Sequence, residues 1–94
     1  MIRLNAVFTL KQGVNSQGVF NIANDLVVKS RQDEGNVSYD LYQSSTDSKI
    51  MLFVETWKNQ EVLDKHSAVS HFTTAAPKIS ALTVDGLKID HFEF

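Results

Sequence analysis

Two of the three histidines are close together in the sequence and are the first candidates for catalysis. His66 and His71 flank the break H-S-A-V-S-H, and His91 is near the C-terminus. Imidazole titrates near neutral pH, so it can act as a general base or acid. If Ser70 caps a helix, the helix dipole disfavours the imidazolium form of His71 and keeps it neutral, as a base must be. Alternatively, both histidines only hydrogen-bond backbone groups at a helix junction.

The same histidines lack the spacing of a metal-binding pair on one helix. They are five residues apart, whereas neighbours on one helical face are three or four apart. A third ligand would have to come from Asp40, Glu55 or His91, and the spacing does not require one. We therefore expect no metal. The chain has no cysteine, which excludes disulfides, thiolate metal sites and cysteine nucleophiles.

Three other side chains carry polar groups that could hold a ligand. Trp57 closes an apolar segment, and its indole N–H could donate to a substrate oxygen; the hydroxyl of Tyr39 could do the same. Asn5 lies mid-strand, where a buried amide needs partners, or else it is exposed near a sheet end. We keep Trp57, Tyr39 and Asn5 as candidate binding residues.

Glu55 follows an apolar segment and shares its side of the strand with Phe53 and Trp57. If it is buried, its carboxylate needs a charged or hydrogen-bonded partner. It could instead pair across a dimer interface or face water. No phosphate-binding glycine loop, nucleophile elbow or catalytic carboxylate pair is recognisable.

Strands and helices must alternate to position these residues. Apolar alternation predicts strands over residues 2–10, 37–44 and 87–94, and the apolar segment from Ile50 to Trp57 predicts another strand. In the first strand, Leu4 and Ala6 share one side and Asn5 lies on the other.

Helical spacing fills the two gaps between these strands. It predicts a helix that starts at Asn15 or Ser16 and stops at Gly35. A short helix over residues 61–66 follows, and then a second piece that Ser70 caps and Pro77 kinks. The order β-α-β-β-α-β favours a ferredoxin-like α+β fold: a four-stranded antiparallel sheet with the helices on one face.

Length and charge exclude several classes of protein. The 94 residues suit one domain over residues 1–94. A net charge of -2 without charge runs speaks against nucleic acid or an anionic membrane as partner. The N-terminal residues lack the long apolar stretch of a signal peptide, and no segment approaches the roughly 20 apolar residues of a membrane span. We expect a cytoplasmic protein.

The strand from Ile50 to Trp57 is apolar on both faces. Ile50, Leu52 and Val54 occupy one face, and Met51 and Phe53 the other. The helices can cover only one of these faces. A second copy of the chain is the simplest cover for the other, so we expect a homodimer packed sheet to sheet.

Three segments resemble the antibiotic biosynthesis monooxygenase domain: E-G-N-V-S-Y-D-L-Y (34–42), F-V-E-T-W-K-N (53–59) and E-V-L-D-K-H-S-A-V-S-H-F (61–72). The resemblance covers about residues 2–92. It implies a dimeric α+β barrel of ferredoxin-like chains. Members of the family include cofactor-free oxygenases of quinols and aromatic phenols, isomerases of a phosphorylated signalling sugar, and a haem-degrading branch.

The resemblance implies a pocket between sheet and helices. Its candidate lining residues are Asn5, Tyr39, Trp57, His66, His71 and Phe72. His66 or His71 would be the base, and Asn5 and Trp57 would hold the substrate or the oxygen intermediate. We expect a monooxygenase without cofactor that oxidises a small aromatic phenol or quinol with dioxygen.

Two other functions stay open. An isomerase of a small phosphorylated hydroxyketone would share Gly35, Asn36 and the Tyr39-Asp40 pair, but only Arg3 or Lys65 could bind its phosphate. A non-catalytic binder of an aromatic metabolite is the other. Haem degradation is not expected, because haem-degrading relatives place their iron-ligating histidine about where Ala76 stands.

Overall fold

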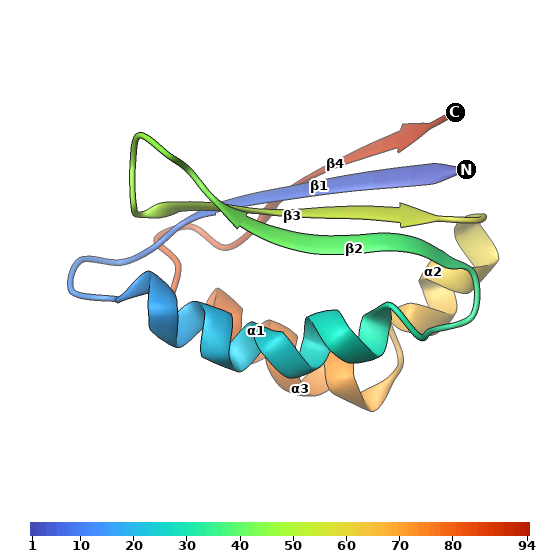
Figure 1. The fold of residues 1–94 in the computed structure, drawn as a ribbon, viewed down its shortest axis with the longest axis horizontal. Helices are drawn as coiled ribbons and strands as arrows, with labels where there is room; N and C mark the ends of the chain where they lie inside the picture. Colours follow the sequence, from blue (N-terminus) through green and yellow to red (C-terminus); the bar gives the residue numbers. More distant parts are fainter.

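The apolar pattern of the chain produces four strands and three helices. The computed structural model describes all 94 residues. In chain order the elements are β1 (Ile2–Thr9), α1 (Ser16–Ser30), β2 (Asn36–Gln43), β3 (Ile50–Trp57), α2 (Gln60–His66), α3 (Ser70–Ser80) and β4 (Lys88–Glu93) (Figure 1). The bounds of β3 are those predicted from the sequence. Helix α1 was predicted to stop at Gly35 but ends at Ser30, because the chain turns over residues 31–35; the other elements differ mostly by a residue or two at their ends.

All the strands pair antiparallel in one sheet of order β2-β3-β1-β4. The apolar strand β3 therefore lies inside the sheet, between β2 and β1. In this register Glu55 lies beside Tyr39 of β2 and beside Leu4 of β1. This topology confirms the ferredoxin-like fold.

Side chains at the helix starts explain where two of the helices begin. Asn15 Oδ1 accepts a hydrogen bond from the Gln17 N–H (2.7 Å), and Asn59 Oδ1 accepts one from the Val62 N–H (3.0 Å). The cap predicted at Ser70 is wrong by one residue. Val69 is the N-cap of α3 and Ser70 is the first helical residue, because the chain leaves the extended region only after Val69 and no side chain caps the helix.

The two helical pieces expected after β3 are present as α2 and α3. They are separated by three residues, so His66 ends one helix and His71 belongs to the first turn of the next. Pro77 lies inside α3, which continues to Ser80. None of the three helices has the length and apolar character that crossing a membrane requires.

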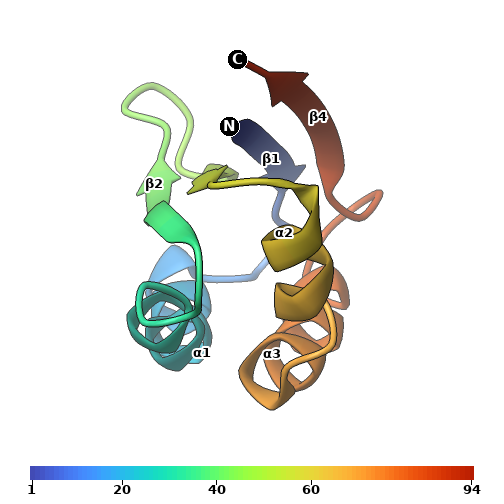
Figure 2. The ribbon, with the colours of Figure 1, turned by 90° about the vertical axis from the view of Figure 1, so that its right-hand side faces the viewer.

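The helices pack on one face of the sheet and the core lies between the two layers. Figure 2 shows α1 below β2, and α2 and α3 below the opposite half of the sheet. The core includes Phe8 and Phe53 from the sheet, Leu26 from α1 and Ile79 from α3, all nearly inaccessible to solvent. Burying each such side chain contributes roughly 1.5–3 kcal/mol to folding.

The other face of the sheet has no element over it. Along β3, Met51, Phe53 and Glu55 are buried against the helices, whereas Leu52 and Val54 are only half-buried. The expectation that the helices cover one face of this apolar strand is confirmed.

Candidate active site

A tight turn after α1 brings a carboxylate to the end of α2. Gly35 in this turn has φ +77°, and a Cβ on it would lie only 2.6–2.8 Å from the Val62 side chain. Glycine therefore allows the turn to approach α2 this closely. The Gly35 carbonyl also accepts a hydrogen bond from the Lys58 N–H (2.8 Å), which ties the turn to the end of β3. The same turn holds Asp33 opposite His66.

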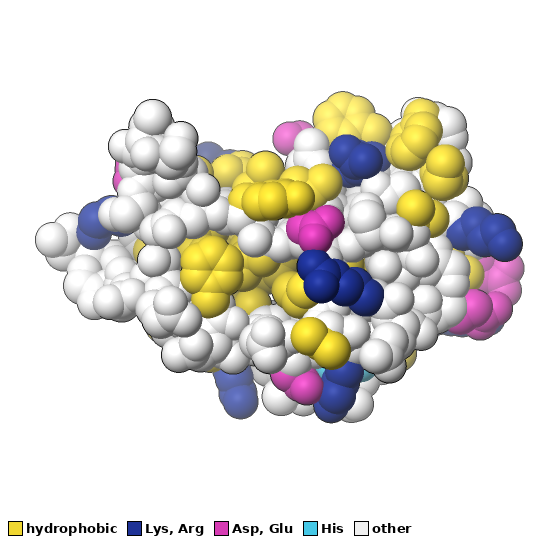
Figure 3. All heavy atoms as spheres, viewed as in Figure 1, with side chains coloured by type: hydrophobic (Ala, Val, Ile, Leu, Met, Phe, Trp, Pro, Cys, Tyr) yellow, Lys and Arg dark blue, Asp and Glu magenta, His cyan; other side chains and the backbone are white.

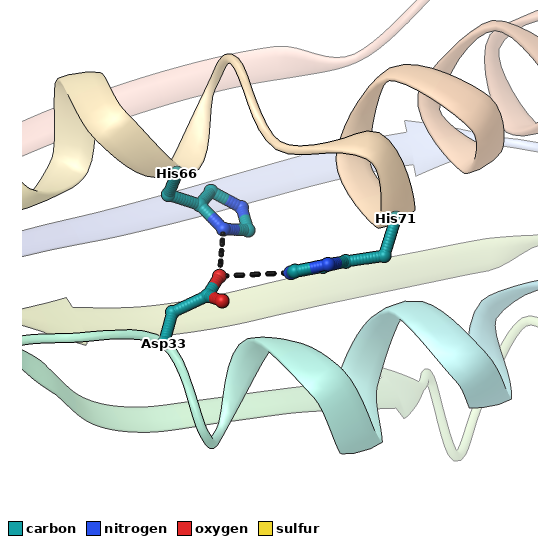
Figure 4. A group of neighbouring side chains, drawn as sticks. All are labelled: Asp33, His66 and His71. Carbon is teal, nitrogen blue, oxygen red and sulfur yellow. Dashed lines mark hydrogen bonds and ion pairs between the residues drawn. The ribbon is translucent and has the colours of Figure 1, made fainter.

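Asp33 joins the two histidines (Figure 4). Its Oδ2 lies 2.9 Å from His66 Nδ1 and 2.8 Å from His71 Nε2. A carboxylate oxygen only accepts hydrogen bonds, so we assign a proton to each of these two ring nitrogens. One carboxylate thus orients two imidazoles that come from two different helices.

This arrangement leaves the second ring nitrogen of His66 free. In the neutral ring, a proton on Nδ1 makes Nε2 an acceptor. His66 is 2% exposed, and its Nε2 is buried without a hydrogen-bond partner. Burial lowers the pKa of His66, while the hydrogen bond and the charge of Asp33 act in the opposite direction. His66 is therefore a neutral imidazole with an unused acceptor.

His66 lines a cavity of about 300 Å³ between the sheet and the helices. Eleven of the 15 lining residues are hydrophobic, among them Leu4, Leu63 and Phe72. No lysine or arginine lines the cavity. A site of this size lies at the lower end of the range for small-molecule sites, and its walls suit an apolar ligand.

Glu55 is a second ionisable group on the cavity wall. It is 7% exposed, and its Oε1 accepts a hydrogen bond from the indole N–H of Trp57 (2.9 Å). Burial raises the pKa of Glu55 to about 7, and the hydrogen bond from Trp57 opposes this shift. Near neutral pH, protonated and ionised forms of this carboxyl are both populated.

Aromatic rings surround His66. Its ring centroid lies 4.5 Å from that of Trp57, 5.1 Å from Phe72 and 5.5 Å from Tyr39. Burial, followed by the negative charge of Glu55, raises the pKa of Tyr39 far above its ordinary value. Tyr39, which lines the cavity, therefore keeps its phenolic proton.

Comparison with known proteins identifies the family. A model described as antibiotic biosynthesis monooxygenase matches residues 1–78. The chain belongs to the antibiotic biosynthesis monooxygenase family. The resemblance found in the sequence is thereby confirmed.

Solved structures and one sequence relative agree with this assignment. A conserved protein of unknown function from Bacteroides thetaiotaomicron VPI-5482 is 33% identical, with a TM-score of 0.89 over 99% of this chain and 96% of that one. A crystal structure of an antibiotic biosynthesis monooxygenase is 28% identical, with a TM-score of 0.91 over 100% and 98%. YcnE of Bacillus subtilis (strain 168), named as a candidate monooxygenase, is 34% identical over 50 residues. That match covers 53% of each protein, so it spans about half the length of YcnE.

In this family member, three of the residues expected to line the pocket do line the cavity: Tyr39, His66 and Phe72. Trp57 is buried beside His66, and its N–H already donates to Glu55. His71 hydrogen-bonds to Asp33, the same carboxylate that His66 contacts, and 11% of its side chain is exposed. Both were expected in the lining, and neither is part of it.

Asn5, which was expected in the pocket lining, is not part of the cavity wall. Leu4 and Ala6 line the cavity, so Asn5 between them points to the opposite face of the sheet, because side chains alternate along a strand. Its Oδ1 is buried there without a hydrogen-bond partner. Asn5 therefore does not contact a ligand in the cavity of its own chain.

Sequence reasoning did not single out Asp33, and it left the environment of Glu55 open. The E-x-W spacing already indicated that Glu55 and Trp57 lie on the same side of β3. Nothing in the local sequence marks Asp33, whose partners are more than 30 residues away.

Asp33, His66 and His71 are also the group best placed to hold a metal ion. Their ligand atoms lie within 4.8 Å of one another, and two imidazoles with a carboxylate suit Zn²⁺ or a similar cation. None of the third ligands considered from the sequence joins them. Asp40 pairs with Arg31, Glu55 with Trp57 and His91 with Gln60.

A second hollow, of about 270 Å³, lies between α1 and β2, where Figure 3 shows hydrophobic side chains gathered. Phe20 and Val27 are among its lining residues. Its two charged groups, Arg31 and Asp40, pair with each other at 2.8 Å. It holds no histidine, so the cavity beside His66 is the better candidate for catalysis.

Proposed function

We propose that the chain is a monooxygenase that oxidises a small aromatic phenol or quinol with dioxygen and needs no cofactor. The observation that carries this proposal is that His66 lines an apolar cavity and that its buried Nε2 has no hydrogen-bond partner. Membership of the antibiotic biosynthesis monooxygenase family supports it.

His66 is the general base in this proposal. A phenolic O–H bound at Nε2 gives its proton to the ring, and the imidazolium that forms keeps its Nδ1–H bond to Asp33. The resulting phenolate is electron-rich and can pass electrons to dioxygen. His71 supports this step by holding the same oxygen of Asp33.

The walls of the cavity favour this chemistry. Their apolar side chains offer few hydrogen-bond partners to water, and a bound substrate in drier surroundings makes stronger hydrogen bonds and forms better-protected oxygen intermediates. The neutral hydroxyl of Tyr39 supplies a donor for a substrate oxygen, and Phe72 offers a ring against which an aromatic substrate can pack.

The structure gives less support to an isomerase of a phosphorylated substrate. The cavity offers no lysine or arginine to a phosphate. Arg3 donates to Thr56 Oγ1 on the far face of the sheet, and Lys65 pairs with two exposed glutamates. A phosphate in the cavity would face Glu55 without a counter-charge.

We also propose that the working unit is a homodimer packed through the uncovered face of the sheet. On this face, Val7, Leu52 and Val54 are half-buried. Two large side chains are more exposed: Tyr42 at 54% and Phe92 at 50%. A partner chain would cover these groups and could supply a donor to Asn5 Oδ1.

Oxygen uptake with a panel of dihydroxynaphthalene-type quinols tests the catalytic proposal. We expect the wild-type protein to consume oxygen in the presence of a chelator and without added flavin. His66→Ala should lower kcat by about 10²–10⁴-fold, the usual contribution of a general base. His91→Ala is the matched control, because His91 is exposed and bonds only to Gln60. No turnover across the panel, or equal losses in both variants, would contradict the proposal.

A further inference from the structure

We propose that Glu55 is a second acid–base catalyst in this cavity and that its carboxyl group protonates the oxygen intermediate. This inference rests on the proposed monooxygenase function. It assigns to Glu55 a role separate from that of His66, which removes the first proton.

The surroundings of Glu55 favour such a role. Of its two oxygens, only Oε1 has a partner, the indole N–H of Trp57, and Oε2 makes no hydrogen bond within the chain. No ion pair of the chain includes Glu55. An uncompensated carboxylate in an apolar cavity is costly, and holding a proton relieves that cost.

The groups that face Glu55 do not offset its charge. Tyr39 of β2 is a neutral phenol beside it, and His66 of α2 is a neutral imidazole on the same cavity. The walls that α1, α3, β1 and β4 contribute are apolar apart from one serine, Ser80. At neutral pH the cavity therefore contains one neutral base, His66, and one carboxylic acid, Glu55, that can keep its proton.

Oxygenation of a phenol needs this pair. Once His66 has taken the phenolic proton, a ring carbon of the phenolate bonds to dioxygen, and the substrate electrons reduce the oxygen to a peroxide anion. Glu55 gives its carboxyl proton to this anion. The carboxylate that results then takes the C–H proton of the same carbon, a C=O bond forms and the O–O bond breaks. The departing hydroxide takes the proton that His66 holds, so the products are a quinone and water and both residues regain their starting forms.

The alternative is that Glu55 only positions Trp57 through their hydrogen bond. Glu55→Gln separates the two roles, because the amide oxygen can still accept from the indole N–H but the amide cannot deliver a proton. Trp57→Phe is the complementary variant, since it removes the donor and keeps the carboxyl.

We expect Glu55→Gln to lower kcat with a quinol by about 10²-fold or more while binding the quinol within a few-fold of the wild-type affinity. The wild-type kcat/KM should fall on the alkaline side as Glu55 ionises, with a midpoint near its pKa of about 7. This alkaline decline should disappear in Glu55→Gln and persist in Trp57→Phe. Glu55→Asp, which retains an acid, should recover part of the rate.

Thermal unfolding gives a readout that does not depend on activity. The folded-state pKa of Glu55 is raised above its ordinary value of 4.5, so the unfolded chain releases this proton at a lower pH than the folded one. The wild-type Tm, measured relative to that of Glu55→Gln, should therefore fall as pH rises from about 4.5 to 7 and level off above.

The outcomes separate the two proposals. An active wild-type protein whose Glu55→Gln variant keeps its kcat and its alkaline decline would overturn the role of Glu55 and leave the monooxygenase proposal standing. Equal effects of Glu55→Gln and Trp57→Phe on the pH profile would mean that Glu55 only positions Trp57. A wild-type protein that turns over no quinol would overturn both proposals.

Discussion

At the scale of single residues, Asp33 decides which nitrogen of His66 keeps a free lone pair. Its Oδ2 fixes a proton on His66 Nδ1, and this leaves the lone pair on the buried Nε2. Without the carboxylate, either ring nitrogen could hold the proton. The function proposed for His66 therefore depends on a residue that does not line the cavity.

We expect Asp33→Asn to lower kcat on the order of 100-fold or more with little change in substrate binding. The amide no longer compensates an imidazolium and no longer imposes one tautomer on His66; the same change in a Ser-His-Asp catalytic triad lowers kcat by about 10⁴-fold. Steady-state oxygen uptake measures the change. Asp40→Asn is the control, because the exposed pair of Asp40 with Arg31 lies in the other hollow. Equal rates for the two variants would argue against a role for Asp33.

The sequence predicted part of this site. It singled out His66 and His71, which the structure brings to one carboxylate; their catalytic roles stay predictions. Asn5, which was expected in the pocket lining, lies on the opposite face of the sheet, as the alternation of β1 with Leu4 and Ala6 already indicated. Asp33 could not be found, since only the folded chain brings residues 33, 66 and 71 together.

At the scale of elements, the turn between α1 and β2 determines how the site is assembled. The turn carries Asp33, and its approach to α2 requires Gly35, whose position leaves no room for a Cβ beside Val62. The carboxylate and the two helix ends therefore depend on one backbone conformation.

We expect Gly35→Ala to lower the free energy of unfolding by about 2–5 kcal/mol, because left-handed backbone costs roughly 1–2 kcal/mol and overpacking roughly 1–3 kcal/mol. Urea unfolding measures the loss. Gly13→Ala is the matched control: its φ is also positive, at +85°, but a Cβ there meets nothing within 4 Å. The control should lose only the backbone contribution. Equal losses in the two variants would show that the contact with Val62 is unimportant.

The sequence predicted the elements well and their ends less well. The run from Ile50 to Trp57 marked β3 without error, because it is short and rich in β-branched and aromatic residues, which favours a buried strand over a helix. The start of α3 was misplaced because Ser70 is a good capping residue by type, but the backbone turns one residue earlier. The antiparallel sheet with its helices on one face followed from the β-α-β-β-α-β pattern rather than from any single residue.

At the scale of the whole molecule, the two faces of the sheet differ in what covers them. One face carries the helices and the cavity, and the other presents Leu52 and Val54 of β3 without cover. Burial of these groups in a dimer would account for an apolar content that one small chain cannot enclose.

We expect the wild-type protein to be a dimer at micromolar concentration and Leu52→Lys to be a monomer. A lysine in the middle of this apolar face would lose its hydration in the interface without gaining a partner. Size-exclusion chromatography with light scattering measures the mass. Val84→Lys changes an exposed valine outside the sheet and should stay dimeric. A monomeric wild-type protein would contradict the sheet-to-sheet arrangement.

The position of strand β4 at the edge of the sheet affects how firmly one wall of the cavity is held. It pairs only with β1, at the edge of the sheet, and all six of its residues are exposed. Yet Ile89 of this strand and Leu87 just before it form part of the cavity wall. Edge strands with few buried contacts open at a lower free energy than the core does. This part of the cavity wall is thus held by fewer buried contacts than the parts formed by the core residues, and local opening of β4 would open the cavity on this side.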